Sequence, residues 1–74
     1  MVFKVNNMEI GKRIRELRLE NNMSQTKLAK FLKTTQDTVS LWALGKSYPS
    51  LDCLVELTKI FNVSSDYLLG IKEI

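Results

Sequence analysis

The side chains that could carry chemistry in this sequence are amides, hydroxyls and isolated charges. The 74-residue chain has no histidine and a single cysteine, Cys53. An intramolecular disulfide is therefore impossible, and a Cys/His zinc site lacks the three or four ligands it needs. No paired-carboxylate pattern or phosphate-cradling glycine loop predicts catalysis. We expect no enzymatic activity, no cofactor and no metal, and we expect Cys53 to be unreactive and to lie off the core stripe of its helix.

Several side chains between residues 25 and 47 could contact the edges of bases. Gln36 can bond the N7 and N6 positions of adenine, and Asp37 can accept from the N4 amino group of cytosine. Leu41 could contact a thymine methyl group. A carboxylate also suits the first turn of a helix, so for Asp37 this structural role remains equally open.

Two short helices joined by a tight turn would position these residues. Ser24 is a good N-cap for a helix that ends near residue 32, and Thr35 can cap a second helix over 36–44, which Gly45 ends. The first of these helices has the apolar stripe Leu28, Ala29 and Leu32. The arrangement over 25–44 is typical of a helix-turn-helix, in which the first helix crosses the DNA backbone and the second lies in the major groove.

Three further helices are predicted around this pair. The first spans 8–21, where Asn21-Asn22 suits a left-handed stop. It begins with a capping box, in which Asn6 accepts from the helix and Glu9 reaches back to the cap amide. The fourth helix is expected to begin after the N-cap Ser50 and to stop at Asn62. The last helix is expected to begin after Ser64 or Ser65 and to stop at Gly70. The expected apolar faces are Ile10, Ile14 and Leu17 in the first helix, and Leu51, Leu54, Val55, Thr58 and Phe61 in the fourth.

Composition agrees with one small all-α domain. Hydrophobic residues make up 45% of the chain, with three glycines and one proline, too few breakers for an all-β fold. Residues 1–33 hold eight Lys/Arg and three Glu, a balance of +5, whereas residues 34–74 hold three Lys and five Asp/Glu, a balance of −2. The basic half suggests a face for a polyanion.

The expected organisation is an N-terminal extension (1–7), the domain (8–70) and a C-terminal tail (71–74). Residues 2–5 alternate like a strand, although chain ends more often fray. No apolar run approaches the roughly 20 residues that span a bilayer, and residues 1–7 lack the apolar core of a signal peptide. We therefore expect a cytoplasmic protein with no membrane partner.

Several segments, taken in order, resemble the Cro and phage-repressor type of helix-turn-helix regulators, also described as xenobiotic-response-element-like. The resemblance runs from about Ile10 to Gly70. The matching pieces are residues 10–18, Met23-Ser24-Gln25 with Leu28-Ala29, Thr38-Val39-Ser40 with Trp42, Gly45 and Lys46, Pro49-Ser50-Leu51, and Asn62-Val63-Ser64. It implies a compact bundle of five short helices of the lambda-repressor type that binds operator DNA. It also implies a homodimer on an inverted repeat with half-sites about one helical turn apart, and favours a phage or mobile-element repressor.

The expected DNA-contacting residues fall into two sets. Those expected to contact bases are Gln36, Asp37, Ser40 and Leu41, and the resemblance implies that Gln25 braces Gln36. Those expected to contact the DNA backbone are Gln25, Lys27, Thr35, Thr38, Lys46 and Ser47. Lys12 and Arg13 are further phosphate candidates, because the start of the first helix could approach the backbone. The alternative for each polar residue is an ordinary solvated side chain.

Three positions depart from the family pattern. Lys33 stands where a glycine with positive φ is common, which should cost up to about 1 kcal/mol. Leu41 replaces a polar or basic residue often used on bases. Ala43 replaces a glutamate that pairs with the arginine matching Arg18, so Arg18 must find another carboxylate, a backbone carbonyl or solvent.

Two alternatives remain open. Phe31, Trp42, Phe61 and Tyr67 could stack on bases, but core packing is the better interpretation for all except Phe31. A second function hypothesis is a protein-binding module, such as an antirepressor or antitoxin-like partner, because no Lys or Arg occurs between Thr34 and Gly45 while Leu41 and Leu44 are expected to be exposed. The candidate dimer surfaces are Leu19, Leu44, Val2-Phe3-Val5, Ile71 and Ile74.

Overall fold

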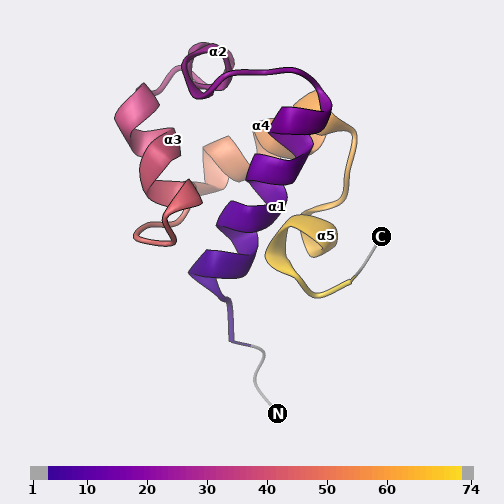
Figure 1. Ribbon diagram of the computed structural model, residues 1–74. Helices are drawn as coiled ribbons and strands as arrows, with labels where there is room; N and C mark the ends of the chain where they lie inside the picture. Colours follow the sequence, from indigo (N-terminus) through magenta and orange to yellow (C-terminus); the bar gives the residue numbers. More distant parts are fainter. Residues whose placement is uncertain (1–3, 73–74) are drawn as a thin grey trace.

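The computed structural model describes residues 4–72, and all regular structure within this range is helical. The elements are α1 (Asn7–Glu20), α2 (Gln25–Phe31), α3 (Gln36–Ala43), α4 (Leu51–Phe61) and α5 (Ser65–Leu69). In Figure 1, α1 runs through the middle of the molecule, with α3 on one side and α5 on the other. None of the helices described is long and apolar enough to cross a membrane. Val2, Phe3 and Ile74, named above for a strand-like end or a dimer surface, lie outside the described residues.

The predicted N-caps are confirmed. The hydroxyl oxygen of each capping residue accepts the backbone N–H three residues further on, at distances between 3.0 and 3.2 Å. These capping residues are Ser24, Thr35, Ser50 and Ser64. Since each satisfies one N–H that the helix itself cannot, the four caps fix where α2, α3, α4 and α5 begin.

The predicted helix stops are also confirmed, because residues with left-handed backbone follow the helices. Asn22 and Asn62 each have a φ of 53°, and Gly45 and Gly70 have φ values of 72° and 80°. Asparagine and glycine tolerate this conformation better than other residues do.

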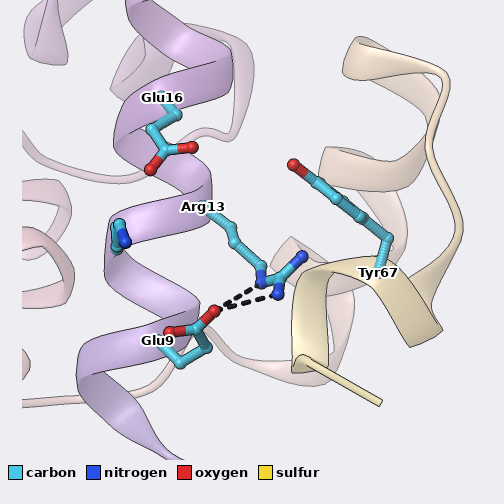
Figure 2. A pocket seen from close by; sticks show the side chains of 5 residues that line it. Glu9, Arg13, Glu16 and Tyr67 are labelled. Carbon is cyan, nitrogen blue, oxygen red and sulfur yellow. Dashed lines mark hydrogen bonds and ion pairs between the residues drawn. The ribbon is translucent and has the colours of Figure 1, made fainter. Parts of the chain in front are cut away.

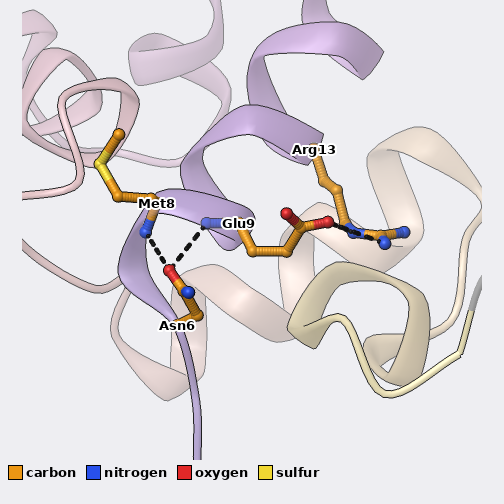
Figure 3. Close-up of polar contacts among 4 residues, drawn as sticks. All are labelled: Asn6, Met8, Glu9 and Arg13. Atoms are coloured by element: carbon orange, nitrogen blue, oxygen red, sulfur yellow. Dashed lines mark hydrogen bonds and ion pairs between the residues drawn. The ribbon is translucent and has the colours of Figure 1, made fainter.

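The capping box at the start of α1 is only half formed (Figure 3). The Asn6 side-chain oxygen accepts the backbone N–H groups of Met8 at 2.9 Å and Glu9 at 3.2 Å, as predicted. The Glu9 carboxylate does not reach back to the cap. It pairs instead with Arg13, whose Nε and Nη2 both lie 2.9 Å from the same carboxylate oxygen. A guanidinium one turn along the helix offers two charged donors, whereas the cap offers one neutral N–H.

The core draws on all five helices. Its buried apolar residues are Ile10, Ile14, Leu17, Leu28, Ala29, Leu32, Val39, Trp42, Leu57 and Leu68. The predicted apolar faces of α1 and α2 are therefore confirmed. Helices α1 and α3 approach closely at Gly11, where an added Cβ atom would lie 1.9 Å from the Trp42 carbonyl oxygen. This contact seats α3 on the central helix.

The predicted buried face of α4 is wrong in part. Its one fully buried residue is Leu57, whereas Leu51 is 80% exposed and Val55 is 50% exposed. Cys53, expected to lie off the core stripe, packs against the core, and so does Ile60. Apolar residues surround most of α4, so their spacing alone does not determine which side faces inward.

Candidate nucleic-acid interface

The second and third helices form the predicted helix-turn-helix. Between them, Lys33 has the expected positive φ, 56°, and the Thr34 N–H donates to the Ala29 carbonyl at 2.9 Å. Helix α3 packs on α1 and α2 through Val39 and Trp42, each only 2% exposed. The opposite side of α3 therefore points away from the protein.

Gln25 and Gln36 meet at the N-terminal end of α3. They are the first residues of their helices, and the Gln36 side-chain N–H donates to the side-chain carbonyl oxygen of Gln25. This bond fixes the orientation of the Gln36 amide and leaves its carbonyl oxygen and second N–H able to face outward. Thr35 and Thr38 lie at the same end, with their hydroxyl oxygens 2.9 Å apart.

The outer side of α3 carries the other expected base-contacting residues. Asp37 is exposed, Ser40 is half-buried, and Leu41 is 41% exposed. Leu44, the C-cap of α3, is more exposed still. The surface is thus mostly uncharged, with one carboxylate near its N-terminal end.

The expected phosphate-contacting residues flank this surface and do not form one cluster. Gln25, Thr35 and Thr38 lie beside Gln36 at the start of α3. Lys27 is exposed in the first turn of α2, and its backbone N–H donates to Ser24. Beyond the far end of α3, Lys46 is exposed and Ser47 is half-buried. Donors and a lysine thus stand near each end of α3, as a helix lying between two DNA strands needs.

Arg13 is not available for DNA, which corrects its assignment as a phosphate candidate (Figure 2). It is 8% exposed, it pairs with Glu9, and its guanidinium carbon lies 4.7 Å from the centre of the Tyr67 ring on α5. This contact lies between α1 and α5, the side of α1 away from α3 in Figure 1. The signal was present in the sequence, because Arg13 is three residues after Ile10 and four before Leu17, on the buried face.

Arg18 bonds a backbone carbonyl, one of the three alternatives expected for it. Its Nη1 donates to the Met23 carbonyl at 2.8 Å, and the Met23 N–H donates to the Arg18 carbonyl at 2.9 Å. The two residues thus close the loop between α1 and α2 from both sides. Arg18 supports the start of the helix-turn-helix without a glutamate at position 43.

The aromatic residues confirm the core interpretation. Trp42 is buried, Phe61 and Tyr67 pack against the core, and Phe31 is exposed. Base stacking by a set of aromatic residues therefore has no geometric basis among the described residues.

A short helix, a tight turn and a second helix with an outward polar end, all held on a helical core, define a helix-turn-helix domain. A family model described as Helix-turn-helix matches residues 14–68. The chain belongs to this family, in its Cro and phage-repressor type.

The chain is similar to transcriptional regulators in sequence and to a repressor in structure. It is 34% identical over 67 residues, 90% of its length, both to the HTH-type transcriptional activator BcrR of Enterococcus faecalis and to the HTH-type transcriptional regulator ImmR of Bacillus subtilis (strain 168). The matched region is 33% of BcrR and 53% of ImmR, so the chain spans about a third to a half of these relatives. The structure of the P22 c2 repressor in complex with synthetic operator 9T superposes with a TM-score of 0.79 at 30% identity, covering 85% of this chain and 96% of that one.

Proposed function

We propose that this chain is a sequence-specific double-stranded DNA-binding transcriptional regulator that places α3 in the major groove of an operator. The observation that carries the proposal is the hydrogen-bonded pair Gln25–Gln36 at the exposed end of α3 within a helix-turn-helix. Family membership and the repressor–operator complex to which the chain is similar support it.

The proposed base contacts follow from the groups that α3 directs outward. With one N–H of Gln36 bonded to Gln25, its second N–H and its carbonyl oxygen can bond N7 and N6 of adenine. Leu41 contacts a thymine methyl, and Ser40 bonds either kind of base edge. Asp37 accepts from cytosine N4, or stabilises the first turn of α3.

The proposed backbone contacts hold α3 in register. Each lysine that neutralises a phosphate releases a condensed counterion and adds affinity without sequence preference. The residues in this role are Gln25, Lys27, Thr35, Thr38, Lys46 and Ser47. The operator is an inverted repeat bound by a homodimer in the cytoplasm, and no enzymatic step is needed.

Selection from a random pool of duplexes at physiological salt, followed by sequencing, tests the proposal. The expected result is an inverted repeat with half-site centres about 10 base pairs apart. The Gln36→Ala variant should lose roughly 5- to 150-fold of its preference for adenine at one position per half-site, the loss of one bidentate contact. A Gln36→Ala protein that enriches the same bases as the wild type would contradict the assignment, and no enrichment by the wild type would overturn the proposed function.

We propose repression by operator occupancy as the regulatory outcome. A reporter whose promoter overlaps the selected operator should lose transcription when the protein is expressed. The same reporter with the two half-sites scrambled is the control. A rise in transcription from the intact reporter would instead assign activation, the role named for BcrR.

The exposed leucines of α3 support one alternative, a protein-binding module. The variant Leu41→Arg separates the two hypotheses. A DNA-binding α3 should gain nonspecific, salt-sensitive DNA affinity and keep its site preference. If α3 instead binds a protein, the Leu41→Arg substitution should abolish that binding and should produce no sequence-specific binding to DNA.

A further inference from the structure

We infer that Arg18 is a positioning residue for base recognition, which acts by fixing the loop that leads into α2. The inference deepens the proposed function, on which it rests for the contact between Gln36 and adenine. Arg18 lies in the last turn of α1 and is not one of the residues proposed to contact DNA. Its effect on recognition therefore passes through the protein, by a series of contacts that the structure contains.

The first contacts hold the loop of residues 21–24, which joins α1 to α2 (Figure 1). The Arg18 carbonyl accepts the Met23 N–H at 2.9 Å and the Asn21 N–H at 3.2 Å. The Asn21 side chain donates to the Leu17 carbonyl at 2.7 Å. The Met23 carbonyl, where the chain turns toward α2, is held by the Arg18 guanidinium at 2.8 Å. The guanidinium thus ties the far end of the loop back to α1.

The loop controls where α2 begins, because α2 packs mainly on α3 rather than on α1. Ser24 caps α2 by accepting the Lys27 N–H at 3.0 Å, and Gln25 is the first residue of the helix. Gln25 therefore follows the held Met23 carbonyl by only two residues. The first residues of a helix have no intrahelical partners for their N–H groups, so a shift of the loop reaches Gln25 first.

The last contact joins Gln25 to Gln36. Gln36 is exposed, and its side-chain N–H donates to the side-chain carbonyl oxygen of Gln25. Bidentate recognition of adenine needs the carbonyl oxygen and the second N–H of this amide at fixed positions. An amide that is free to rotate must be ordered when DNA binds, which reduces the gain from the correct base. Arg18 therefore affects the preference for adenine through Gln25.

The anchoring of α3 does not depend on Arg18. Helix α3 is held in the core by Val39 and Trp42, and Ala43 offers no carboxylate with which a guanidinium could pair. Loss of the Arg18 guanidinium should therefore loosen the Gln25–Gln36 pair and leave the rest of α3 in place. The effect on recognition should be confined to the base that Gln36 contacts, and the base assigned to Leu41 should be recognised as before.

The test compares Arg18→Met, which keeps an unbranched side chain of similar helix propensity, with Arg15→Met, which removes the same charge from an exposed position of α1. Binding is measured on the selected operator and on operators with single base substitutions. Arg18→Met should lose roughly 3- to 30-fold of the preference for adenine, part of what one bidentate contact provides. Its preference at the base assigned to Leu41 should stay within about twofold. Arg15→Met should keep both preferences.

A double-mutant cycle identifies the route. In a Gln25→Ala background, Arg18→Met should cost no further preference for adenine, because the residue through which Arg18 acts is absent. The slope of log affinity against log salt concentration should be unchanged by Arg18→Met, whereas loss of a direct phosphate contact would reduce its magnitude by about 0.9. Such a reduction, equal losses with and without Gln25, or an unchanged preference for adenine would overturn the inference and leave the proposed function intact.

Nuclear magnetic resonance of the free protein gives a measurement that needs no DNA. The Gln36 side-chain amide should be less ordered in Arg18→Met than in the wild type, and Arg18→Lys, which keeps a charged donor, should lie between them. Circular dichroism checks folding, and Arg18→Lys replaces Arg18→Met in both experiments if Arg18→Met is unfolded. An equally ordered amide in all three proteins would overturn the inference. Failure of the wild type to select any operator would instead overturn the proposed function and, with it, the recognition role of Arg18.

Discussion

Lys33 holds a left-handed backbone conformation in the turn between α2 and α3, with a φ of 56°. A Cβ atom is unfavourable there, whereas glycine adopts the conformation freely. The turn keeps its shape because Thr34 is bonded to Ala29 and Thr35 caps α3. Lys33 therefore stores strain in the turn that positions α3.

Lys33→Gly should raise the free energy of unfolding by up to about 0.5 kcal/mol, after the greater freedom of glycine in the unfolded chain has offset part of the gain. Lys30→Gly, inside α2, is the matched control and should lower it by about 1 kcal/mol. Urea titration of both variants measures the difference. Destabilisation of equal size in the two would show that Lys33 is not strained.

Arg13 and Arg18 show how far the position of a single side chain can be predicted from the sequence. Because alanine stands at position 43 in place of the family's glutamate, the sequence predicts that Arg18 needs another partner. Only the folded loop identifies this partner as the Met23 carbonyl. Arg13 has the helical spacing of a core residue, yet its charge argues for solvent. Its place is decided by α5, which supplies the Tyr67 ring.

At the scale of elements, the close contact between α1 and α3 fixes the position of α3 on the core. At Gly11 the backbone of α3 passes so near that a Cβ atom would lie 1.9 Å from the Trp42 carbonyl oxygen. The atoms in the way belong to the backbone of α3, which cannot move aside as the end of a flexible side chain can. Any larger residue must therefore push the two helices apart.

Gly11→Ala should lower the free energy of unfolding by about 1–3 kcal/mol, the usual cost of overpacking, despite the better helix propensity of alanine. Operator affinity should fall as well, because α3 is displaced. The exposed neighbour Lys12→Ala is the control for stability. Thermal unfolding and a binding titration check both effects, and an unchanged or raised midpoint for Gly11→Ala would refute the tight crossing.

Helix boundaries could be predicted because their signals are local. Each cap lies next to the helix it starts, and each left-handed residue lies next to the helix it ends, so sequence spacing contains the information. The inward side of α4 could not be predicted, because it depends on which neighbours the helix meets. Its apolar residues allow two arcs, and α5 and the core select the one centred on Leu57.

At the scale of the whole molecule, charge is distributed unevenly between the N-terminal and C-terminal parts of the chain. Two of the basic residues in the first half, Arg13 and Arg18, are used inside the protein. Under the proposed function, the exposed lysines and Arg15 must therefore supply most of the attraction for DNA. Among them are Lys27, in the first turn of α2, and Lys46, beyond the end of α3.

Lys27→Ala and Lys46→Ala should each weaken binding to all DNA sequences alike. Each should also reduce the magnitude of the slope of log affinity against log salt concentration by about 0.9. Lys59→Ala, on α4 beside Glu56 and outside the residues proposed to contact DNA, is the control and should leave the slope unchanged. Titrations at several salt concentrations measure the slopes. A change of site preference without a change of slope would mean that these lysines contact bases.

The residues that anchor α3 and those that face outward from it are different residues. Val39 and Trp42 hold the helix in the core, while Gln36, Asp37 and Leu41 lie outside it. Exposed positions accept substitution at a cost within about 0.5 kcal/mol. Under the proposed function, descendants of this sequence can therefore acquire new operator preferences by changing a few surface residues, and the same scaffold can be reprogrammed in the laboratory without redesigning its fold.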